Sequence, residues 1–335
     1  MNNPSGAIPA PRQRDGWWIL ALLAIAAVFG ETVASANTPL LAYVVRPATL
    51  PFLMIAYGCW ALLLREAWVR GWIGWPAAIL LGIAYAAFNE GIVADTWFRA
   101  AQFSYSSFRL GRIDGVNWCL IASLSVFHTF ASMGMPIAVV QAWRGETTPR
   151  PWLRVRGMTM CVALVALVAF GFLHGVGGKP AEDQRARAVT ASMIALIVAA
   201  CFVLPRLRPR PCIGVAPSLR RVLITGLGFA VGVLAVHFFI PAAFGIASVP
   251  VAVALGVVIW RYLWQRTSLT GAAGWTPRHT IALIFGGLVP PLIGDLLLIP
   301  VLQPVTVLAT VAGLWRLDRM LKARRPGEVR PAPVG

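Results

Sequence analysis

Residues 73–93 have the sequence IGWPAAILLGIAYAAFNEGIV. The run is long enough to cross the hydrocarbon core of a bilayer as a single helix, which takes about 20 apolar residues. Its only carboxylate, Glu90, stands between Asn89 and Gly91. A charged side chain in the hydrocarbon core is costly, so such a residue usually faces the protein interior and marks a functional site. The stretch predicts a membrane-spanning helix with a functional residue near its end.

Nine further apolar segments accompany this one. The sequence is 58% hydrophobic and only 12% charged, with a mean hydropathy of +0.73, values that exclude an ordinary soluble globular protein. We therefore predict an all-α fold, a polytopic transmembrane helix bundle of about ten spans, or eight if the last two segments form one hairpin. The segments cover residues 17–36, 50–64, 73–93, 117–143, 158–176, 189–204, 222–240, 246–260, 280–299 and 301–315.

The basic residues predict an orientation. With the N-terminus inside, 22 of the 29 Lys and Arg residues fall in cytoplasmic segments, as the positive-inside rule requires. We therefore expect both termini in the cytoplasm. Residues 1–16 form a cytoplasmic N-terminal segment, residues 17–315 the transmembrane domain, and residues 316–335 a basic, Pro-rich cytoplasmic tail.

The same charges bear on partners and location. The net charge of +17 is spread over short clusters between apolar runs, with no basic domain, which argues against nucleic-acid binding. Only two of the 29 basic residues are Lys, and Ala, Gly and Pro are abundant, a composition typical of a GC-rich bacterial genome. The expected location is a bacterial inner membrane, with membrane lipids as the immediate partners.

Polar residues inside the predicted spans fall at a common depth. Given the orientation above, five of them lie about 21–26 Å above the inner face, in the outer half of the core. They are Glu31, Glu90, His174, His237 and Asp295, and His128 lies nearer the midplane. Shared depth on separate helices predicts one polar site that opens toward the outer face.

Each candidate also has a structural interpretation. Glu31 can be wet near its helix end, His174 can mark the entry to a glycine-rich loop, and His237 can form an interhelical hydrogen bond. Asp295 follows Pro290-Pro291, a pattern typical of a broken helix that lines a cavity. Glu66 is expected to be a paired surface group at the inner interface, outside the site.

The chemistry of the set favours proton transfer. A carboxylate opposite an imidazole can activate water as a general base or carry a proton through a transporter. The sequence contains no metal-binding spacing and no nucleophile motif, and its five cysteines stand singly, so no cofactor is predicted.

Residues 75–180 resemble the CAAX-protease and bacteriocin-processing family of intramembrane glutamate proteases. Asn89-Glu90 stands at the family's Glu-Glu pair and matches its second Glu, His128 stands at the next motif's histidine, and His174 at the third motif's. The flanking positions differ, with Ala94, Leu124 and Gly178 where the family has Arg, Phe and Asn or Asp. The resemblance implies that Glu90 activates water, that His128 and His174 orient it, and that the substrate is a membrane-embedded peptide or lipid-like molecule.

Two alternatives remain open at this point. A proton-coupled secondary transporter would account for intramembrane carboxylates and for the Pro290-Pro291 pattern ahead of Asp295. A non-catalytic membrane scaffold would use the same polar groups to hold its helices together.

Overall fold

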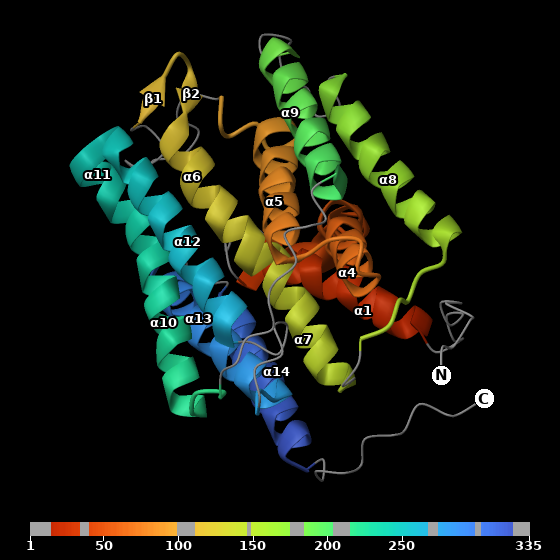
Figure 1. Ribbon diagram of the computed structural model, residues 1–335, viewed down its shortest axis with the longest axis vertical. Helices are drawn as coiled ribbons and strands as arrows, with labels where there is room; N and C mark the ends of the chain where they lie inside the picture. The colour runs from red at the N-terminus through yellow and green to blue at the C-terminus, as the bar shows by residue number, and fades with distance from the viewer. Residues whose placement is uncertain are drawn as a thin grey trace.

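The structure is a computed structural model that describes residues 15–33, 40–98, 111–145, 149–174, 184–203, 215–266, 274–298 and 303–323. Nearly all of these residues are helical, as the predicted all-α fold requires, and one short hairpin contains the two strands found among them (Figure 1). The elements in chain order are α1 (Asp15–Val28), η1 (Phe29–Val33), α2 (Leu40–Val45), α3 (Thr49–Leu53), η2 (Met54–Gly58), α4 (Cys59–Val69), α5 (Trp75–Ala86), η3 (Ala87–Val93), β1 (Arg112–Ile113), β2 (Val116–Asn117), α6 (Trp118–Phe127), η5 (His128–Gly134), α7 (Met135–Arg144), α8 (Val155–Leu173), α9 (Gln184–Val203), α10 (Leu219–Leu234), η7 (Ala235–Phe239), α11 (Ile240–Phe244), η8 (Gly245–Ala247), α12 (Ser248–Arg266), α13 (Pro277–Leu298) and α14 (Gln303–Ala323).

Seven helices are long and apolar enough to cross a membrane, and they coincide with the first seven predicted spans. A shorter apolar helix falls on the eighth predicted span, and α13 and α14 fall on the last two. These lengths and compositions are those of a helical membrane protein. The seven helices are Asp15–Val33, Thr49–Val69, Pro76–Val93, Trp118–Arg144, Val155–Leu173, Arg185–Phe202 and Leu219–His237.

Five of these seven helices contain a π-helical segment, namely η1, η2, η3, η5 and η7. The N–H of Ala94 donates to the carbonyl of Asn89, and that of Met135 to the carbonyl of Phe130. Each bond spans five residues, where an α-helix spans four. Because π-helical turns are rare and frequently mark functional sites, their recurrence indicates where function is to be sought in this bundle.

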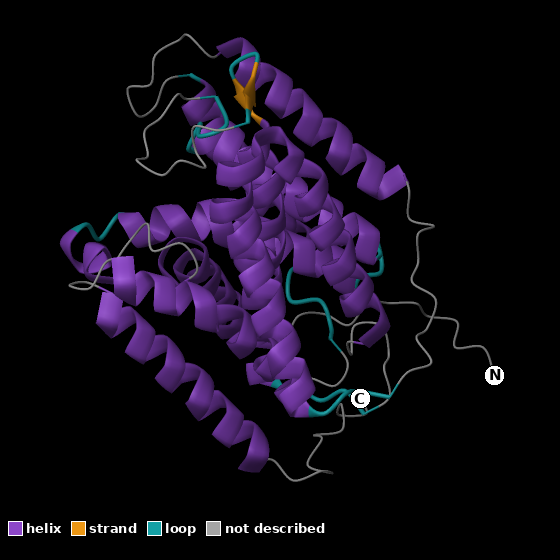
Figure 2. Cartoon of the chain, turned by 90° about the vertical axis from the view of Figure 1, so that its left-hand side faces the viewer, coloured by secondary structure: helices purple, strands orange, loops and turns teal. Residues whose placement is uncertain are grey.

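The main core lies where α1, η2, α4, α5 and α7 meet, near the centre of Figure 1. Its largest fully buried side chains include Tyr57, Tyr85 and Trp152. Helices α8 and α9 stand at one side of this core, and α10, α12 and α13 stand at the other. Figure 2 shows the hairpin of β1 and β2 at one end of the bundle, beside the end of a helix. Exposed apolar side chains on α8, such as Leu167 and Phe170, are suited to contact lipid.

Helices α10 and α13 approach each other at backbone distance. A Cβ added at Gly226 would lie 2.2 Å from the carbonyl oxygen of Leu283, and one at Gly286 would lie 2.2 Å from that of Leu223. Small residues permit such close packing between membrane helices. Glycines on both sides of the contact therefore hold α10 and α13 together as a pair.

The break predicted at Pro290-Pro291 is wrong. Helix α13 continues through both prolines and ends at Leu298. Neighbouring helices help membrane helices to tolerate proline, and α10 packs closely along α13. Asp295 lies on this continuous helix, but its side chain is outside the part of the chain that the structure describes.

One end of the bundle is joined by buried ion pairs. The carboxylate of Asp15, at the start of α1, lies 2.8 Å from both Arg144 and Arg150. Arg144 ends α7, and Arg150 lies in the segment that leads to α8. The contacts place the start of α1, the end of α7 and the start of α8 on one side of the molecule.

The expected surface position of Glu66 is also wrong. The side chains of Glu66 and Arg65 are fully buried and lie 2.7 Å apart. Glu66 accepts hydrogen bonds from the backbone N–H groups of Trp152 (2.8 Å) and Leu153 (3.2 Å). The segment before α8 therefore folds over the end of α4 and supplies donors that the local sequence around Glu66 does not reveal.

Candidate functional site

Two π-helical segments bring Glu90 and His128 into direct contact. Glu90 lies on η3 and His128 begins η5, and their Oε1 and Nε2 atoms are 2.8 Å apart. Both side chains are buried, since Glu90 is 7% exposed and His128 is 3% exposed. A carboxylate and an imidazole at this distance can exchange a proton.

Three further groups complete the surroundings of the pair. The Asn89 amide donates to Glu90 Oε1 at 2.9 Å, and the Thr96 hydroxyl donates to Glu90 Oε2. On the other side of the imidazole, His128 Nδ1 lies 2.9 Å from Ser132 Oγ. When the Nε2 proton is donated to Glu90, Nδ1 accepts from the Ser132 hydroxyl, and this second hydrogen bond orients the ring.

A second carboxylate is connected to the pair through Tyr57. The Tyr57 hydroxyl donates to Glu31 Oε1 at 2.6 Å and accepts from the Asn89 amide at 3.2 Å. Glu31, Tyr57, Asn89, Glu90 and His128 thus form one continuous hydrogen-bonded network. These residues come from four helices, and in each helix they lie on its π-helical segment. The four segments are η1, η2, η3 and η5.

The close approach of Glu31 to Tyr57 depends on a glycine. A Cβ added at Gly30 would lie 2.2 Å from the Tyr57 ring, so no larger residue fits there in this arrangement. The aromatic rings of Tyr57, Tyr85 and Phe127 also surround His128, with centroids 5.1–6.4 Å from the imidazole. An aromatic wall lowers the local dielectric, which strengthens the hydrogen bonds inside it.

A short turn after η3 covers Glu90. Thr96 lies in this turn, and the neighbouring Trp97 is 2% exposed. A buried ion pair anchors the turn, because Asp95 Oδ2 lies 2.8 Å from Arg187 on α9. Asp95 adopts a left-handed backbone conformation with φ of 63°, which is uncommon outside glycine. The Asp95–Arg187 pair therefore holds Thr96 in position over the Glu90 carboxylate.

Two other predicted site residues, His237 and His174, have hydrogen-bond partners that are not members of this network. His237, on η7, forms a 3.0 Å hydrogen bond with Ser123 of α6, an interhelical contact of the kind that the sequence suggested as the alternative. His174 ends α8 and is exposed, and its ring contacts the carbonyl and ring of Phe170 on the same helix. The structure does not bring His174 to Glu90.

Sequence reasoning missed five participants, Tyr57, Thr96, Ser132, Asp95 and Arg187. A tyrosine inside an apolar span offers a weak signal, because its buried hydroxyl usually needs a partner. Arg187 was counted only as a charge outside the membrane, and nothing in its local sequence connects it to Asp95. Their roles depend on contacts between distant segments.

The side chains around Glu90 are better suited to acid–base chemistry than to metal binding. Among the described residues, no group of three or more His, Cys, Asp or Glu side chains is arranged to hold a metal ion. The polar partners of Glu90 are one imidazole, one amide and one hydroxyl.

Comparison with known proteins finds no matching family model, no matching curated protein and no matching solved structure.

Proposed function

We propose that this chain is a membrane-embedded hydrolase in which Glu90 activates water and His128 assists. The observation that carries the proposal is the 2.8 Å contact between Glu90 Oε1 and His128 Nε2 inside a buried polar network. The substrate class is a membrane-embedded peptide or a lipid-like molecule, since the pair lies within helices of membrane-spanning length.

In this reaction Glu90 takes a proton from water, and the water oxygen attacks the carbonyl carbon of the substrate. His128 holds the Glu90 carboxylate in place through its Nε2–H, and the proton that Glu90 has taken from the water passes to the leaving group. Asn89 and Ser132 orient the two reacting side chains. Movement of the turn that carries Thr96 would open Glu90 Oε2 to the water.

The proposed setting is a bacterial inner membrane, with about ten spans and both termini in the cytoplasm. The distribution of basic residues supports this orientation, with 22 of 29 on the cytoplasmic side. The orientation puts Glu90 in the outer half of the bilayer, so the substrate bond would be cleaved nearer the outer face.

A proton-coupled transporter is the second candidate. The observation that favours it is the hydrogen-bonded connection from His128 and Glu90 to Glu31, a second carboxylate that is only partly buried. Such a network can pass a proton between carboxylates when its hydroxyl and amide groups reorient.

The deciding experiment compares the protein with its Glu90→Gln variant in liposomes that contain bacterial lipids and membrane peptides. In water that carries a heavy oxygen isotope, a hydrolase places one heavy oxygen in its product, which mass spectrometry detects. Glu90→Gln should fold normally and abolish this incorporation, because the side chain keeps its shape but loses its basicity. Asp318→Asn, at an ion pair on α14, is the control that should retain it.

The same liposomes test the second candidate. Proton flux into them is followed with a pH-sensitive dye under an imposed gradient of pH and of candidate solutes. Proton flux that requires both Glu90 and Glu31, in the absence of isotope incorporation, would show that the protein is a transporter and would refute the hydrolase proposal. Full activity of Glu90→Gln in a deletion strain would refute both.

A further inference from the structure

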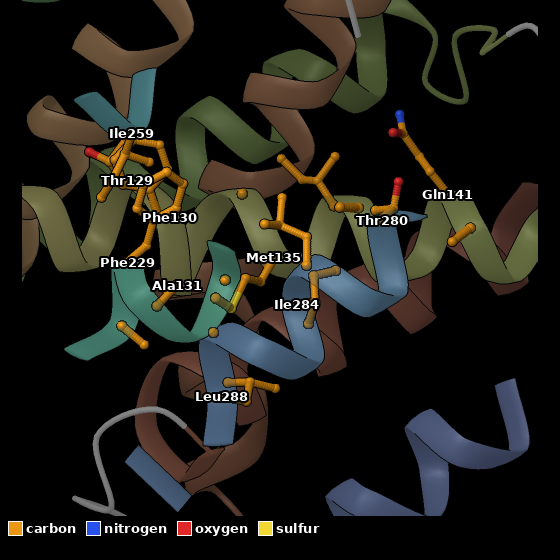
Figure 3. A pocket seen from close by; sticks show the side chains of 18 of the residues that line it. Thr129, Phe130, Ala131, Met135, Gln141, Phe229, Ile259, Thr280, Ile284 and Leu288 are labelled. Carbon is orange, nitrogen blue, oxygen red and sulfur yellow. The ribbon is translucent and has the colours of Figure 1, made fainter. Parts of the chain in front are cut away.

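A large cavity lies beside the site, between η5 and α7 on one side and the α10–α13 pair on the other. Its volume is about 660 Å³, and most of its lining is apolar. Figure 3 shows Phe130 and Met135 on one wall, with Phe229 of α10 and Ile284 and Leu288 of α13 around them. Ligand sites typically combine such a volume and apolar lining with a few convergent polar groups.

Two polar side chains of the cavity lie at one of its ends. Gln141 and Thr280 lie together there in Figure 3, away from Thr129 and Ile259. The Thr280 hydroxyl accepts a hydrogen bond from the indole of Trp275 at 3.0 Å. The amide nitrogen of Gln141 is buried and has no hydrogen-bond partner among the described residues. A buried amide donor without a partner is costly, so this end of the cavity favours an acceptor.

The polar end adjoins a cluster with excess positive charge. Arg65 forms part of the cavity wall and stacks on Trp152, with 3.3 Å from its guanidinium to the ring centroid. Arg144, one turn after Gln141, lies 5.1 Å from the same ring. The cluster is completed by Arg70, Arg150, Glu66 and Asp15, so among the described residues it contains four arginines and two carboxylates.

We infer that this cavity binds one anionic phospholipid, with an acyl chain between η5 and the α10–α13 pair and the headgroup at Gln141. The apolar walls suit an acyl chain, which the surrounding membrane supplies. The phosphate and ester oxygens supply the acceptors that Gln141 needs, and the surplus arginine charge attracts a negative headgroup. Basic pockets between membrane helices recognise anionic headgroups in this way.

The size of the cavity, as well as the charge beside it, indicates what occupies it. Water occupies about 30 Å³ per molecule in the liquid, so the cavity exceeds that volume many times over, yet its apolar walls cannot satisfy water's hydrogen bonds. An empty cavity of this size would forfeit the packing contacts of every side chain that lines it. A flexible hydrocarbon chain fills such a space without either penalty.

The lipid site is independent of the proposed hydrolase. Thr129 lines the cavity, whereas the preceding residue, His128, directs its ring to Glu90. A Cβ added at Gly82 of α5 would lie 2.7 Å from the Thr129 side chain, so α5 and η5 pack tightly between the two regions. Failure of one proposal therefore leaves the other standing.

The experiment uses a phosphatidylglycerol probe with a photoreactive group at the end of one acyl chain. The full-length protein in detergent micelles is irradiated with the probe, and labelled peptides are identified by mass spectrometry. We expect labelling of η5, α7, α10 and α13, competed away by unlabelled phosphatidylglycerol more strongly than by phosphatidylcholine.

Two variants and one control make the result specific. Ala230→Phe fills the cavity from α10, and Gln141→Leu removes the amide, so each should reduce competed labelling several-fold. Val162→Phe makes the same kind of enlargement on the exposed face of α8, which does not line the cavity, and should leave labelling unchanged. Thermal unfolding of each variant verifies its fold, and Gln141→Leu keeps the test valid if Ala230→Phe misfolds.

Four outcomes would overturn the inference. Labelling concentrated on α8 and α9 would show only lipid at the outer surface. Equal labelling of Gln141→Leu and the unchanged protein would remove the headgroup assignment, as would equal competition by phosphatidylcholine. Absence of competed labelling in the four cavity helices would show that the cavity takes no phospholipid.

Discussion

Glu90 meets an imidazole, an amide and a hydroxyl from three different positions in the chain. The sequence made Glu90 and His128 candidates for one site because each interrupts an apolar span, and intramembrane polar residues are rare. It could not predict Tyr57 as the connection to Glu31, because a lone tyrosine in a span is equally typical of core packing. The partners of an isolated polar residue are set by tertiary contacts, which hydropathy does not record.

The buried pair of Asp95 and Arg187 offers a prediction at this scale. Arg187→Met should lower the free energy of unfolding by about 3–5 kcal/mol, because it leaves the Asp95 carboxylate buried without its arginine. Combining Arg187→Met with Asp95→Asn should restore part of that loss, since asparagine is neutral and tolerates the left-handed conformation. Unfolding midpoints in detergent measure both effects.

Arg185 supplies the matched control for this cycle. It lies on the same helix as Arg187 but is exposed, so Arg185→Met should leave stability nearly unchanged. A loss in Arg185→Met equal to that in Arg187→Met would mean that the charge of α9, and not the buried pair, stabilises this region.

At the scale of elements, hydropathy located the long apolar helices but not their internal geometry. The first seven predicted segments coincide with the seven helices of membrane-spanning length. The π-helical segments within them were invisible to the sequence, because the same apolar residues fit either hydrogen-bond pattern. Likewise, Pro290-Pro291 predicted a break that α13 does not have, since its packing against α10 keeps the helix continuous.

The contact between α10 and α13 can be tested with two glycines on one helix. Gly226→Ala should destabilise the protein by about 1–3 kcal/mol, because the added methyl group would lie 2.2 Å from the Leu283 carbonyl oxygen. Gly228→Ala, two residues on, meets no atom within 4 Å and should be neutral or stabilising by up to about 1 kcal/mol. Thermal unfolding in detergent separates the two; equal effects would show that helix propensity, not close packing, governs both positions.

For the whole molecule, the ion pairs join segments to which the basic residues assign the same side of the membrane. Asp15 joins Arg144 and Arg150, and Arg278 at the start of α13 joins Asp318 near the end of α14. Each pair connects segments that the charge distribution assigns to the cytoplasm. The pairing of Asp95 with Arg187 connects two segments assigned to the outside. Charge counting could predict which side a loop occupies, but not which loops touch.

The orientation itself is tested by reporter fusions at positions outside the predicted spans. Alkaline phosphatase fused after Gly115 or Pro241 should be active, because it folds only outside the cytoplasm. Green fluorescent protein fused after Gly145 or Arg325 should fluoresce, because it folds in the cytoplasm. The expected pattern rests on the 22 basic residues assigned to the inner side, whose transfer across the membrane is disfavoured.

Exchanging the two reporters at each position is the control, and both signals should then vanish. An active phosphatase after Gly145 would reverse the orientation and move Glu90 to the inner half of the bilayer, where a cytoplasmic substrate would have to reach it.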